Sequence, residues 1–409
     1  MIMSLKINRI LTATVIMLAS ISVLFVYGCC FPFGPAIQGS KSKYGQEIIV
    51  IYDEMQEDGV EEENNHKIPR SRPFHMGFTP FPYDFTQDAL EFTYANINYH
   101  SDIVIHHFDN GIPWDEALEN SDLPGNIIYD LNDRISRTGK DRQIYLAVTP
   151  LSTYRDKVAG KWGDSQHMEL TGKWKDKSFS DPEIIEAYTN YCRFMIEKFN
   201  PRYFAYGIEV NMLGYHDPHA FKEYLVLVEN VYRSLKESYP DLPVFLTIQL
   251  ETFINYFEDQ KNIVESLLPF TDHIAISSYP FGNFSDPDDI PDDWFSRLYS
   301  MAPEKPVSIA ETAFLAEDLT LERFNGNTIK GSQDHQVEYL DLLFNQMAGL
   351  DCKFITWFVV RDYDELWLKM KEQGADEIFK SWRDTGLIDE DGNPRKALGY
   401  WDKWLSLPK

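Results

Sequence analysis

The sequence predicts an α/β fold in which eight parallel strands and their helices form one (β/α)8 TIM barrel. Short apolar segments alternate with longer amphipathic segments from Arg72 onward, which is typical of parallel strands joined by helices. Eight such units can be counted, and this number favours a barrel over an open doubly wound sheet. No glycine-rich phosphate loop follows the first strand, so a nucleotide-binding sheet is disfavoured.

The strand candidates are short runs rich in aromatic and β-branched residues, and turn residues bound them. They cover residues 74–79, 102–107, 143–148, 203–209, 244–249, 273–278, 306–311 and 353–358. Helices are predicted to begin at Asp181-Pro182 and at Asp217-Pro218, where an aspartate precedes a proline at the first helical position. A third helix is predicted from Gln333 to Met347.

Residues 1–28 predict a targeting segment. Lys6 and Arg9 precede a long uncharged apolar run from Ile10 to Val26. The end of this run resembles a bacterial lipobox with Cys29 as the lipidated residue, although Tyr27 departs from the small residue usual at that place. An uncleaved membrane anchor is the alternative, because the run is nearly long enough to span a bilayer.

Residues 29–72 predict a flexible tether, rich in Gly, Pro, Ser and Lys at first and acidic later. Residues 73–409 then form a single barrel domain. We therefore expect an extracytoplasmic protein, a bacterial cell-surface or periplasmic lipoprotein. It would touch the membrane only through its N-terminal lipid or anchor, and we expect it to be a monomer.

Charge and cysteine content limit the possible partners. The chain has 409 residues and a net charge of −26, which argues against nucleic acid and anionic membrane surfaces as partners. The four cysteines, Cys29, Cys30, Cys192 and Cys352, match no zinc or redox spacing. Two separate buried thiols at Cys192 and Cys352 are the preferred interpretation, and a disulfide between them is the alternative.

Polar and aromatic side chains gather where the predicted strands end, which is where barrel enzymes carry out their chemistry. The second strand ends in His106-His107, the fifth in Gln249 and the sixth in Tyr279, and Arg361 follows the eighth. Each alone is more readily structural, but together they would line one rim. The paired histidines do not predict a metal, because no third ligand follows at a convincing spacing.

Two glutamates stand out, at the ends of the fourth and seventh strands. Strand alternation places Glu209 on the interior face and Ile208 on the helix face, while Glu311 lies across the barrel mouth. Glycosidic cleavage needs two facing carboxyl groups, one ionised and one protonated, the latter with a pKa raised by burial and the neighbouring charge. The alternative is two unrelated rim carboxylates paired with Arg361 or His106.

These segments resemble the clan of retaining glycoside hydrolases with catalytic glutamates on strands four and seven. Residues 207–211 (Gly-Ile-Glu-Val-Asn) are similar to the Gly-Asn-Glu-(Ile/Val)-Asn motif of the arabinogalactan endo-β-1,4-galactanase family. Residues 277–281 (Ser-Ser-Tyr-Pro-Phe) resemble its strand-six motif, residues 310–312 (Ala-Glu-Thr) its nucleophile strand, and residues 385–394 the closing segment of many members.

The resemblance implies a role for each matching residue. Glu209 would be the acid/base, Glu311 the nucleophile and Tyr279 a hydrogen-bond donor to that nucleophile. Trp357 stands where the clan carries its strand-eight tryptophan and would form the floor for a sugar ring. Trp162, Trp174 and Trp294 could extend this floor, and no metal or organic cofactor is required. The remaining substrate-contact candidates are Asn211, His106, Gln249 and Arg361.

Ile208 departs from the family pattern, because the clan has an asparagine there that contacts the substrate's 2-hydroxyl. Either Asn211 or His106 replaces that contact, or the substrate differs, or the protein binds sugar without cleaving it. The sequence therefore predicts a retaining hydrolase of a β-linked, neutral glycan, without galactan specificity. The alternatives are a non-catalytic surface glycan-binding protein and a barrel hydrolase of another bond type with His106 or His107 as base.

Overall fold

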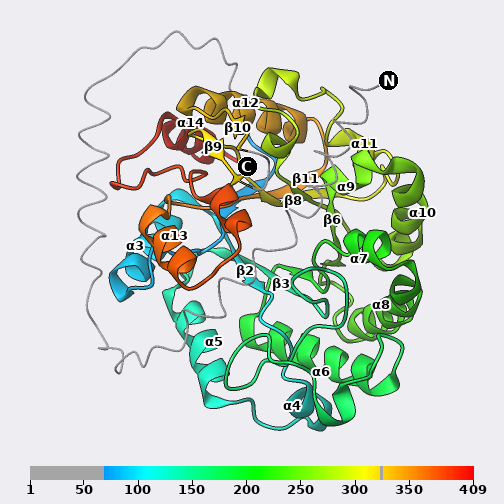
Figure 1. Cartoon of the computed structure of the whole chain (residues 1–409). Helices are drawn as coiled ribbons and strands as arrows, with labels where there is room; N and C mark the ends of the chain where they lie inside the picture. The colour runs from blue at the N-terminus through cyan, green and yellow to red at the C-terminus, as the bar shows by residue number, and fades with distance from the viewer. Residues whose placement is uncertain (1–68, 323–325) are drawn as a thin grey trace.

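The computed structural model describes residues 69–322 and 326–409 of the chain (Figure 1). The predicted signal segment, Cys29 and all but the last residues of the 29–72 tether lie outside the described residues. Within the described ranges, no helix is long and apolar enough to cross a membrane. Cys192 and Cys352 are buried free thiols, which confirms the preferred interpretation and makes the disulfide wrong.

A parallel sheet forms the centre of the molecule, and every predicted strand contributes to it. Its members are β1 (His75–Phe78), β2 (Ile103–Phe108), β3 (Gln143–Val148), β4 (Tyr203–Ala205), β5 (Val244–Phe245), β6 (Thr247–Gln249), β7 (Ile274–Ser278), β8 (Val307–Thr312) and β11 (Cys352–Trp357). They pair in the order β5-β4-β3-β2-β1-β11-β8-β7-β6.

The sheet closes at the fifth predicted strand, because its two edges, β5 and β6, belong to one segment interrupted at Leu246. The Thr247 N–H donates to the Gly207 carbonyl over 3.0 Å, and the Val210 N–H donates to the Thr247 carbonyl over 3.1 Å. These bonds continue the ladder past the end of β4. The predicted (β/α)8 barrel is therefore confirmed.

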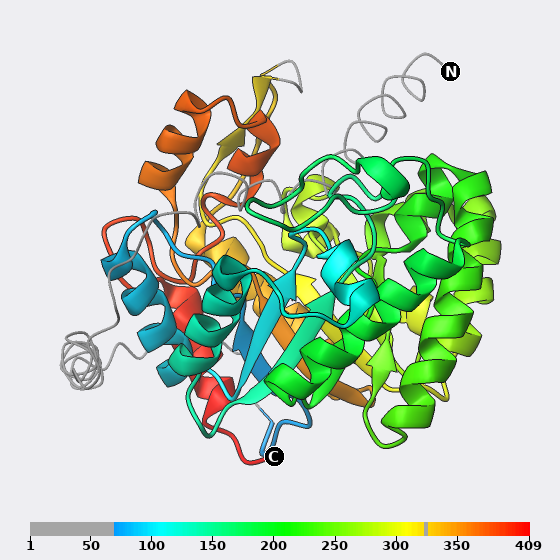
Figure 2. The same cartoon turned by 90° about the horizontal axis from the view of Figure 1, so that it is seen from below.

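Helices surround the strands, as Figures 1 and 2 show. The longer ones are α3 (Gln87–His100), α5 (Gly125–Arg137), α6 (Pro182–Phe199), α8 (Pro218–Ser238), α10 (Phe257–Leu267), α12 (Gln333–Ala348) and α14 (Lys396–Leu405). Shorter ones are α4 (Trp114–Glu119), α7 (Asn211–His216), α9 (Leu250–Asn255), α11 (Ser296–Tyr299) and α13 (Asp364–Glu372). Asp217 caps α8 as predicted, since its side chain accepts from the His219 and Ala220 N–H groups.

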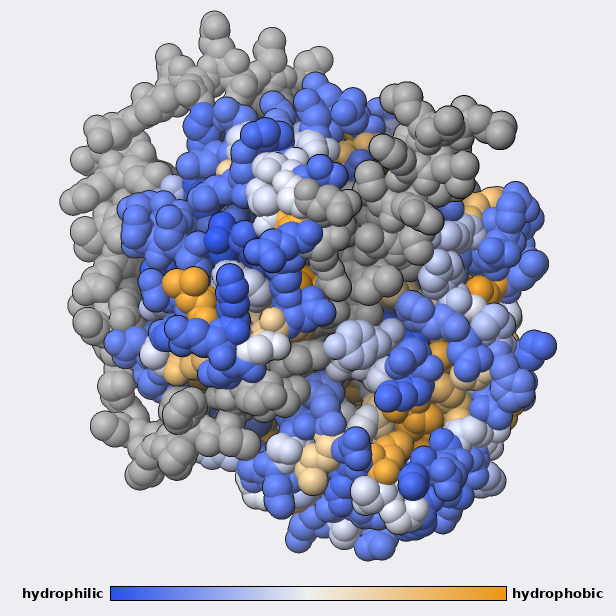
Figure 3. Space-filling model, viewed as in Figure 1, coloured by the Kyte–Doolittle hydropathy of each residue, from blue (hydrophilic) through white to orange (hydrophobic). Residues whose placement is uncertain are grey.

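Beyond the barrel, a small antiparallel pair projects from the segment that follows β8. It consists of β9 (Leu319–Thr320) and β10 (Thr328–Ile329), and Figure 2 shows it beside α13 in the upper left of the view. The face in Figure 3 is mostly hydrophilic, in keeping with the strong net charge, and apolar residues gather in its lower right part.

Strand alternation separates an inner core from an outer one. The inner core holds Ile103, Ile105, Tyr145, Ala147, Tyr203, Ala205, Ile208, Phe245, Ala275, Ala310 and Phe354. Phe204 and Tyr206 belong instead to the larger cluster that the helices cover. The predicted alternation is thus confirmed along β4 itself.

The prediction is wrong at Ile208, which lies in the inner core and not on the helix face. The strand ends at Ala205, earlier than predicted, and residues 206–209 form a bend. Glu209 has a φ of 51°, in the left-handed region that extended strands do not use. Period-two alternation therefore stops before Ile208.

The two ends of the described chain meet on one side of the barrel. The Arg72 N–H donates to the Pro408 carbonyl over 2.9 Å, and Lys409 forms an ion pair with Asp102. Because Arg72 precedes β1, this contact lies at the amino-terminal ends of the strands. Arg72 is 4% exposed and so belongs to the barrel domain.

Candidate active site

Glu209 lies directly beyond β4, in a backbone conformation that few residues other than glycine adopt. Its φ of 51° is held by a hydrogen bond from its N–H to Thr247 Oγ1, at 2.8 Å. Its carboxylate Oε1 accepts from the Ser277 hydroxyl at 2.8 Å, and the residue is 2% exposed. Such conformations cost of order 1–3 kcal/mol and gather at functional sites, so this one indicates a role for Glu209 beyond packing.

The surroundings of Glu209 favour a proton on its carboxyl group. Burial raises its pKa to about 7, the Arg155 guanidinium opposes this rise, and the negative charge of Glu311 adds to it. Arg155 Nε lies 3.6 Å from Glu209 Oε2. A carboxyl group of this kind can hold a proton near neutral pH and release it during a reaction.

Glu311 lies near the end of β8 and has a partner on each carboxylate oxygen. The Tyr279 hydroxyl donates to Oε2 at 2.9 Å, and His107 Nδ1 lies 2.5 Å from Oε1. Burial tends to lower the pKa of His107, but the charge of Glu311 and its hydrogen bond outweigh burial and raise this pKa. Glu311 is therefore held between a cationic imidazole and a phenol hydroxyl.

A buried ion pair connects the rest of the site. Arg155 Nη1 lies 2.5 Å from Asp109 Oδ2, and both side chains are 3% exposed. Arg155 thus stands between Asp109 and Glu209, and the two acidic neighbours together offset its charge.

Sequence reasoning gave no role to Ser277 or Arg155. It considered His107 as a polar strand end, as a metal ligand that it rejected and as a base for another reaction, but not as a partner of Glu311. A signal for His107 was present, because alternation along β2 places it on the same face as Ile103 and Ile105, which line the inner core. Arg155 lies in the loop after β3, where no periodic pattern exists to reveal its direction.

Two of the predicted contact residues lie away from the glutamates. His106 points to the helix layer, where Nε2 lies 2.9 Å from Thr138 Oγ1 and the ring packs against Phe199 at 5.1 Å. Burial lowers its pKa to about 3, so His106 is neutral. Arg361 stacks over the Tyr83 ring at 3.8 Å. The alternative in which the two rim carboxylates pair with Arg361 or His106 is therefore wrong.

Asn211 and Gln249 form hydrogen bonds with each other and with their neighbours, and not with Glu209 or Glu311. The Asn211 amide accepts from the Gln249 N–H at 2.8 Å and donates to the Gln249 carbonyl at 3.1 Å and to Gln260 Oε1 at 2.8 Å. The Gln249 side chain accepts from the Thr252 N–H and donates to Glu251. Both amides are buried, and these bonds fasten α7 to the end of β6.

Trp357 does not form a floor for a sugar ring. It is fully buried in the outer core, its indole N–H donates to the Thr385 carbonyl at 2.8 Å, and its ring lies 6.0 Å from that of Tyr339. Phe354 points inward on the same strand. Because side chains alternate along a strand, Trp357, three positions later, points outward. Trp162, Trp174 and Trp294 are also buried, so none of them offers an open face.

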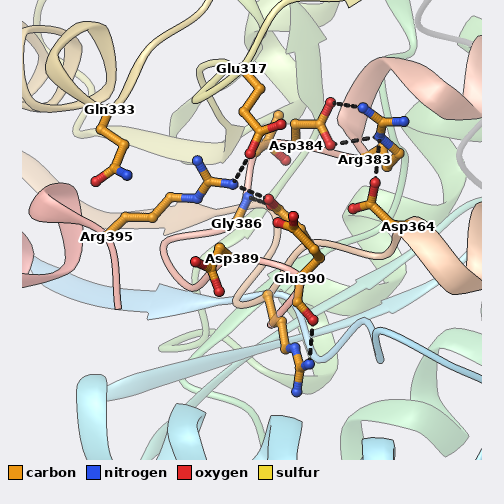
Figure 4. A network of polar contacts seen from close by, with 12 residues as sticks. Glu317, Gln333, Asp364, Arg383, Asp384, Gly386, Asp389, Glu390 and Arg395 are labelled. Atoms are coloured by element: carbon orange, nitrogen blue, oxygen red, sulfur yellow. Dashed lines mark hydrogen bonds and ion pairs between the residues drawn. The ribbon is translucent and has the colours of Figure 1, made fainter. Parts of the chain in front are cut away.

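A second polar network fixes the segments that follow β11 (Figure 4). Arg395 binds Glu317 at 2.9 Å and also Asp362, whose other oxygen accepts from the Gly386 N–H at 2.7 Å. Arg383 forms a bidentate pair with Asp384. In the described ranges there are three groups of His, Asp and Glu side chains in which the possible metal-ligand atoms lie within 4.8 Å of one another. Neither Glu209 nor Glu311 belongs to any of these groups.

The fold is shared with solved glycoside hydrolase structures. No protein-family model and no curated protein matches the sequence. A GH5_18 variant from Streptomyces cattleya in complex with Manb1-4GlcNAc gives a TM-score of 0.57 at 13% identity, over 82% of this chain and 83% of that chain. A GH5_18 variant from Bifidobacterium longum subsp. longum with the same ligand gives 0.58 at 12% identity, over 82% and 79%.

The exo-beta-1,4-mannosidase Op5Man5 from Opitutaceae bacterium strain TAV5 gives a TM-score of 0.56 at 13% identity. The match covers 84% of this chain and 61% of that one. Likenesses at such identity show the fold. They leave the chemistry of this chain to be argued from its own residues.

Proposed function

We propose that this protein is a retaining glycoside hydrolase with Glu311 as nucleophile and Glu209 as acid/base. One observation carries the proposal: two neighbouring rim carboxyl groups have different surroundings. Glu209 has a pKa raised to about 7, whereas Glu311 is held between the His107 imidazole and the Tyr279 hydroxyl. A proton donor beside an ionised carboxylate is the arrangement that double displacement requires.

In the first step, Glu209 gives its proton to the glycosidic oxygen while Glu311 bonds to the anomeric carbon and the leaving group departs. The resulting ester removes the negative charge of Glu311, which is one of the causes that raise the pKa of Glu209. The pKa of Glu209 therefore falls when it must act as a base. In the second step, Glu209 takes a proton from water, the water oxygen bonds to the anomeric carbon, and Glu311 is released.

For the substrate class, we propose a neutral, β-linked oligosaccharide or polysaccharide. The net charge of −26 disfavours a polyanionic glycan. The structural neighbours include an exo-β-1,4-mannosidase and complexes with Manb1-4GlcNAc, which supports a β-linked sugar. Galactan specificity is not proposed, because Ile208 replaces the asparagine of that family's motif.

For location and assembly, we propose an extracytoplasmic monomer that Cys29 anchors to a bacterial membrane through lipid. The support is the charged and then apolar start of the sequence, which ends at Cys29.

The proposed function is tested by a reducing-end assay over a panel of neutral β-glycans and aryl β-glycosides. The wild type should cleave at least one of them, and Glu311→Gln should abolish this activity. Glu304→Gln is the matched control, because it makes the same chemical change at an exposed position. NMR of the first product formed should show the anomeric configuration of the substrate, and an inverted product would exclude double displacement.

A second candidate is a glycan-binding protein that keeps the barrel but does not turn over substrate. Ile208 favours it, because this apolar side chain lies in the inner core beside Glu209, where the clan places a sugar-binding amide. Tight binding without cleavage across the panel, with an affinity that Glu311→Gln leaves unchanged, would support this candidate against hydrolysis.

A further inference from the structure

A third buried carboxylate, Glu251, lies in the same part of the barrel and takes no part in the proposed reaction steps. It belongs to α9, directly after β6, and is 1% exposed. Among the described residues, no lysine, arginine or histidine forms an ion pair with it. Burying an ionisable group without a cation is costly, and an apolar side chain would fill the same volume without that cost. The carboxylate therefore calls for an explanation other than packing.

The oxygens of Glu251 are occupied by donors from two neighbouring strand ends. Oε1 accepts from the Ser278 hydroxyl at 2.7 Å and from the Tyr279 N–H at 2.9 Å, and Oε2 accepts from Gln249 Nε2 at 2.5 Å. Tyr279 directly follows β7, so its N–H has left the strand ladder and needs another acceptor. Glu251 supplies that acceptor.

Tyr279 connects this carboxylate to the proposed nucleophile. Its N–H donates to Glu251, while its hydroxyl donates to Glu311 Oε2 at 2.9 Å. The Trp382 ring meets the Tyr279 ring edge to face at 5.6 Å, which limits sideways motion of the phenol. The position of the Tyr279 backbone therefore determines the position of its hydroxyl group.

Ser278 adds a second connection to the same strand ends. Its hydroxyl donates to Glu251 and accepts from the Trp294 indole N–H at 3.1 Å. Its carbonyl accepts from the Thr312 hydroxyl at 2.8 Å, and Thr312 is the residue after Glu311. Both connections run from Glu251 toward Glu311.

We propose that Glu251 is a positioning residue, which holds the ends of β7 and β8 so that the Tyr279 hydroxyl stays on Glu311. This inference rests on the proposed hydrolase function. Glu251 has no direct hydrogen bond to either glutamate of the pair, and it acts on Glu311 through Tyr279 and Ser278.

The first test is a double-mutant cycle with Glu251→Gln and Tyr279→Phe. Glu251→Gln places an amide donor next to the three groups that donate to Glu251, so the end of β7 should shift. A misplacement near 1 Å should lower kcat about 100-fold. In the Tyr279→Phe background the same change should cost less than about threefold, because the hydroxyl to be positioned is already absent. Glu258→Gln, at an exposed glutamate of α10, is the matched control and should keep wild-type kcat.

A merely structural role would lower the melting temperature and give equal losses in both backgrounds. Equal losses, or wild-type kcat in Glu251→Gln, would overturn the inference.

A crystal structure of Glu251→Gln separates this inference from the proposed function, since it needs no turnover. The Tyr279 hydroxyl should leave hydrogen-bond distance of Glu311, whereas Glu258→Gln should keep the contact at 2.9 Å. An unchanged contact in Glu251→Gln overturns the inference whether or not a substrate is found. A displaced contact supports the inference. It does so even if the wild type has no activity and the hydrolase proposal is thereby refuted.

Discussion

His107 and Tyr279 bind opposite oxygens of Glu311, at 2.5 and 2.9 Å. One partner brings a positive charge and the other a neutral hydroxyl, and they come from β2 and from the end of β7. Two partners therefore fix the orientation of the Glu311 carboxylate, and one of them is positively charged. These two contacts are the basis of the first prediction.

Replacing His107 should impair the nucleophile more than the fold. In His107→Gln the positive partner of Glu311 is lost, so kcat should fall by a factor of about 10–100. Steady-state kinetics measure this loss. His219→Gln, at an exposed histidine, is the control, and the same loss in that variant would contradict the assignment.

Glu209 should make the protein less stable as the pH rises. Its folded-state pKa of about 7 exceeds the ordinary glutamate value of about 4.5, so the folded state holds the proton more tightly than the unfolded state. Stability should fall between about pH 4.5 and 7, and Glu209→Gln should remove part of this fall, of the order of 1–3 kcal/mol. Urea unfolding at pH 5 and pH 8 measures it. A wild type and a variant with the same pH dependence would show that Glu209 titrates normally.

Ile208→Asn should change activity and stability in opposite directions. Ile208 lies in the inner core and not on the helix face, so an amide there would face the same side as the proposed acid/base. Activity should rise on substrates that carry a 2-hydroxyl and stay unchanged on 2-deoxy analogues, while stability falls by about 1–3 kcal/mol. Equal effects on both substrate types would rule out a contact with the 2-hydroxyl. Ile208→Leu controls for the altered packing.

Cys29→Ala should release the protein from membranes without altering the barrel. The expectation follows from the apolar segment that ends at this cysteine. Cell fractionation with an antibody against the barrel domain measures it, and Cys30→Ala is the neighbouring control. Variant protein that remains in the membrane fraction after processing would argue for the uncleaved anchor.

The barrel could be predicted from the sequence because its signals are local and repeated. Apolar runs mark every strand and capping residues mark helix starts, although β4 ends at Ala205, earlier than predicted, and the fifth predicted strand is interrupted at Leu246. The direction of a side chain is predictable only while the strand stays extended. Alternation would have separated His107 from His106 and shown that Trp357 points outward, since Phe354 occupies the inner face.

Other parts of the site could not be predicted in this way. The bend over residues 206–209 ends the alternation and turns Ile208 inward, and the fragment Gly207-Ile208-Glu209 carries no sign of this. Arg155 reaches Glu209 from the loop after β3, and Glu251 reaches Tyr279 from α9. Such contacts join segments far apart in sequence, so tertiary structure alone reveals them.

The contact between Arg72 and Pro408 shows on which side of the barrel the described chain begins. It lies at the amino-terminal ends of the strands, whereas Glu209 and Glu311 lie at the carboxyl ends. Under the proposed lipid anchoring, the tether would therefore join the domain on the side opposite the two carboxylates. A glycan could then approach the glutamates from the face that the tether does not occupy.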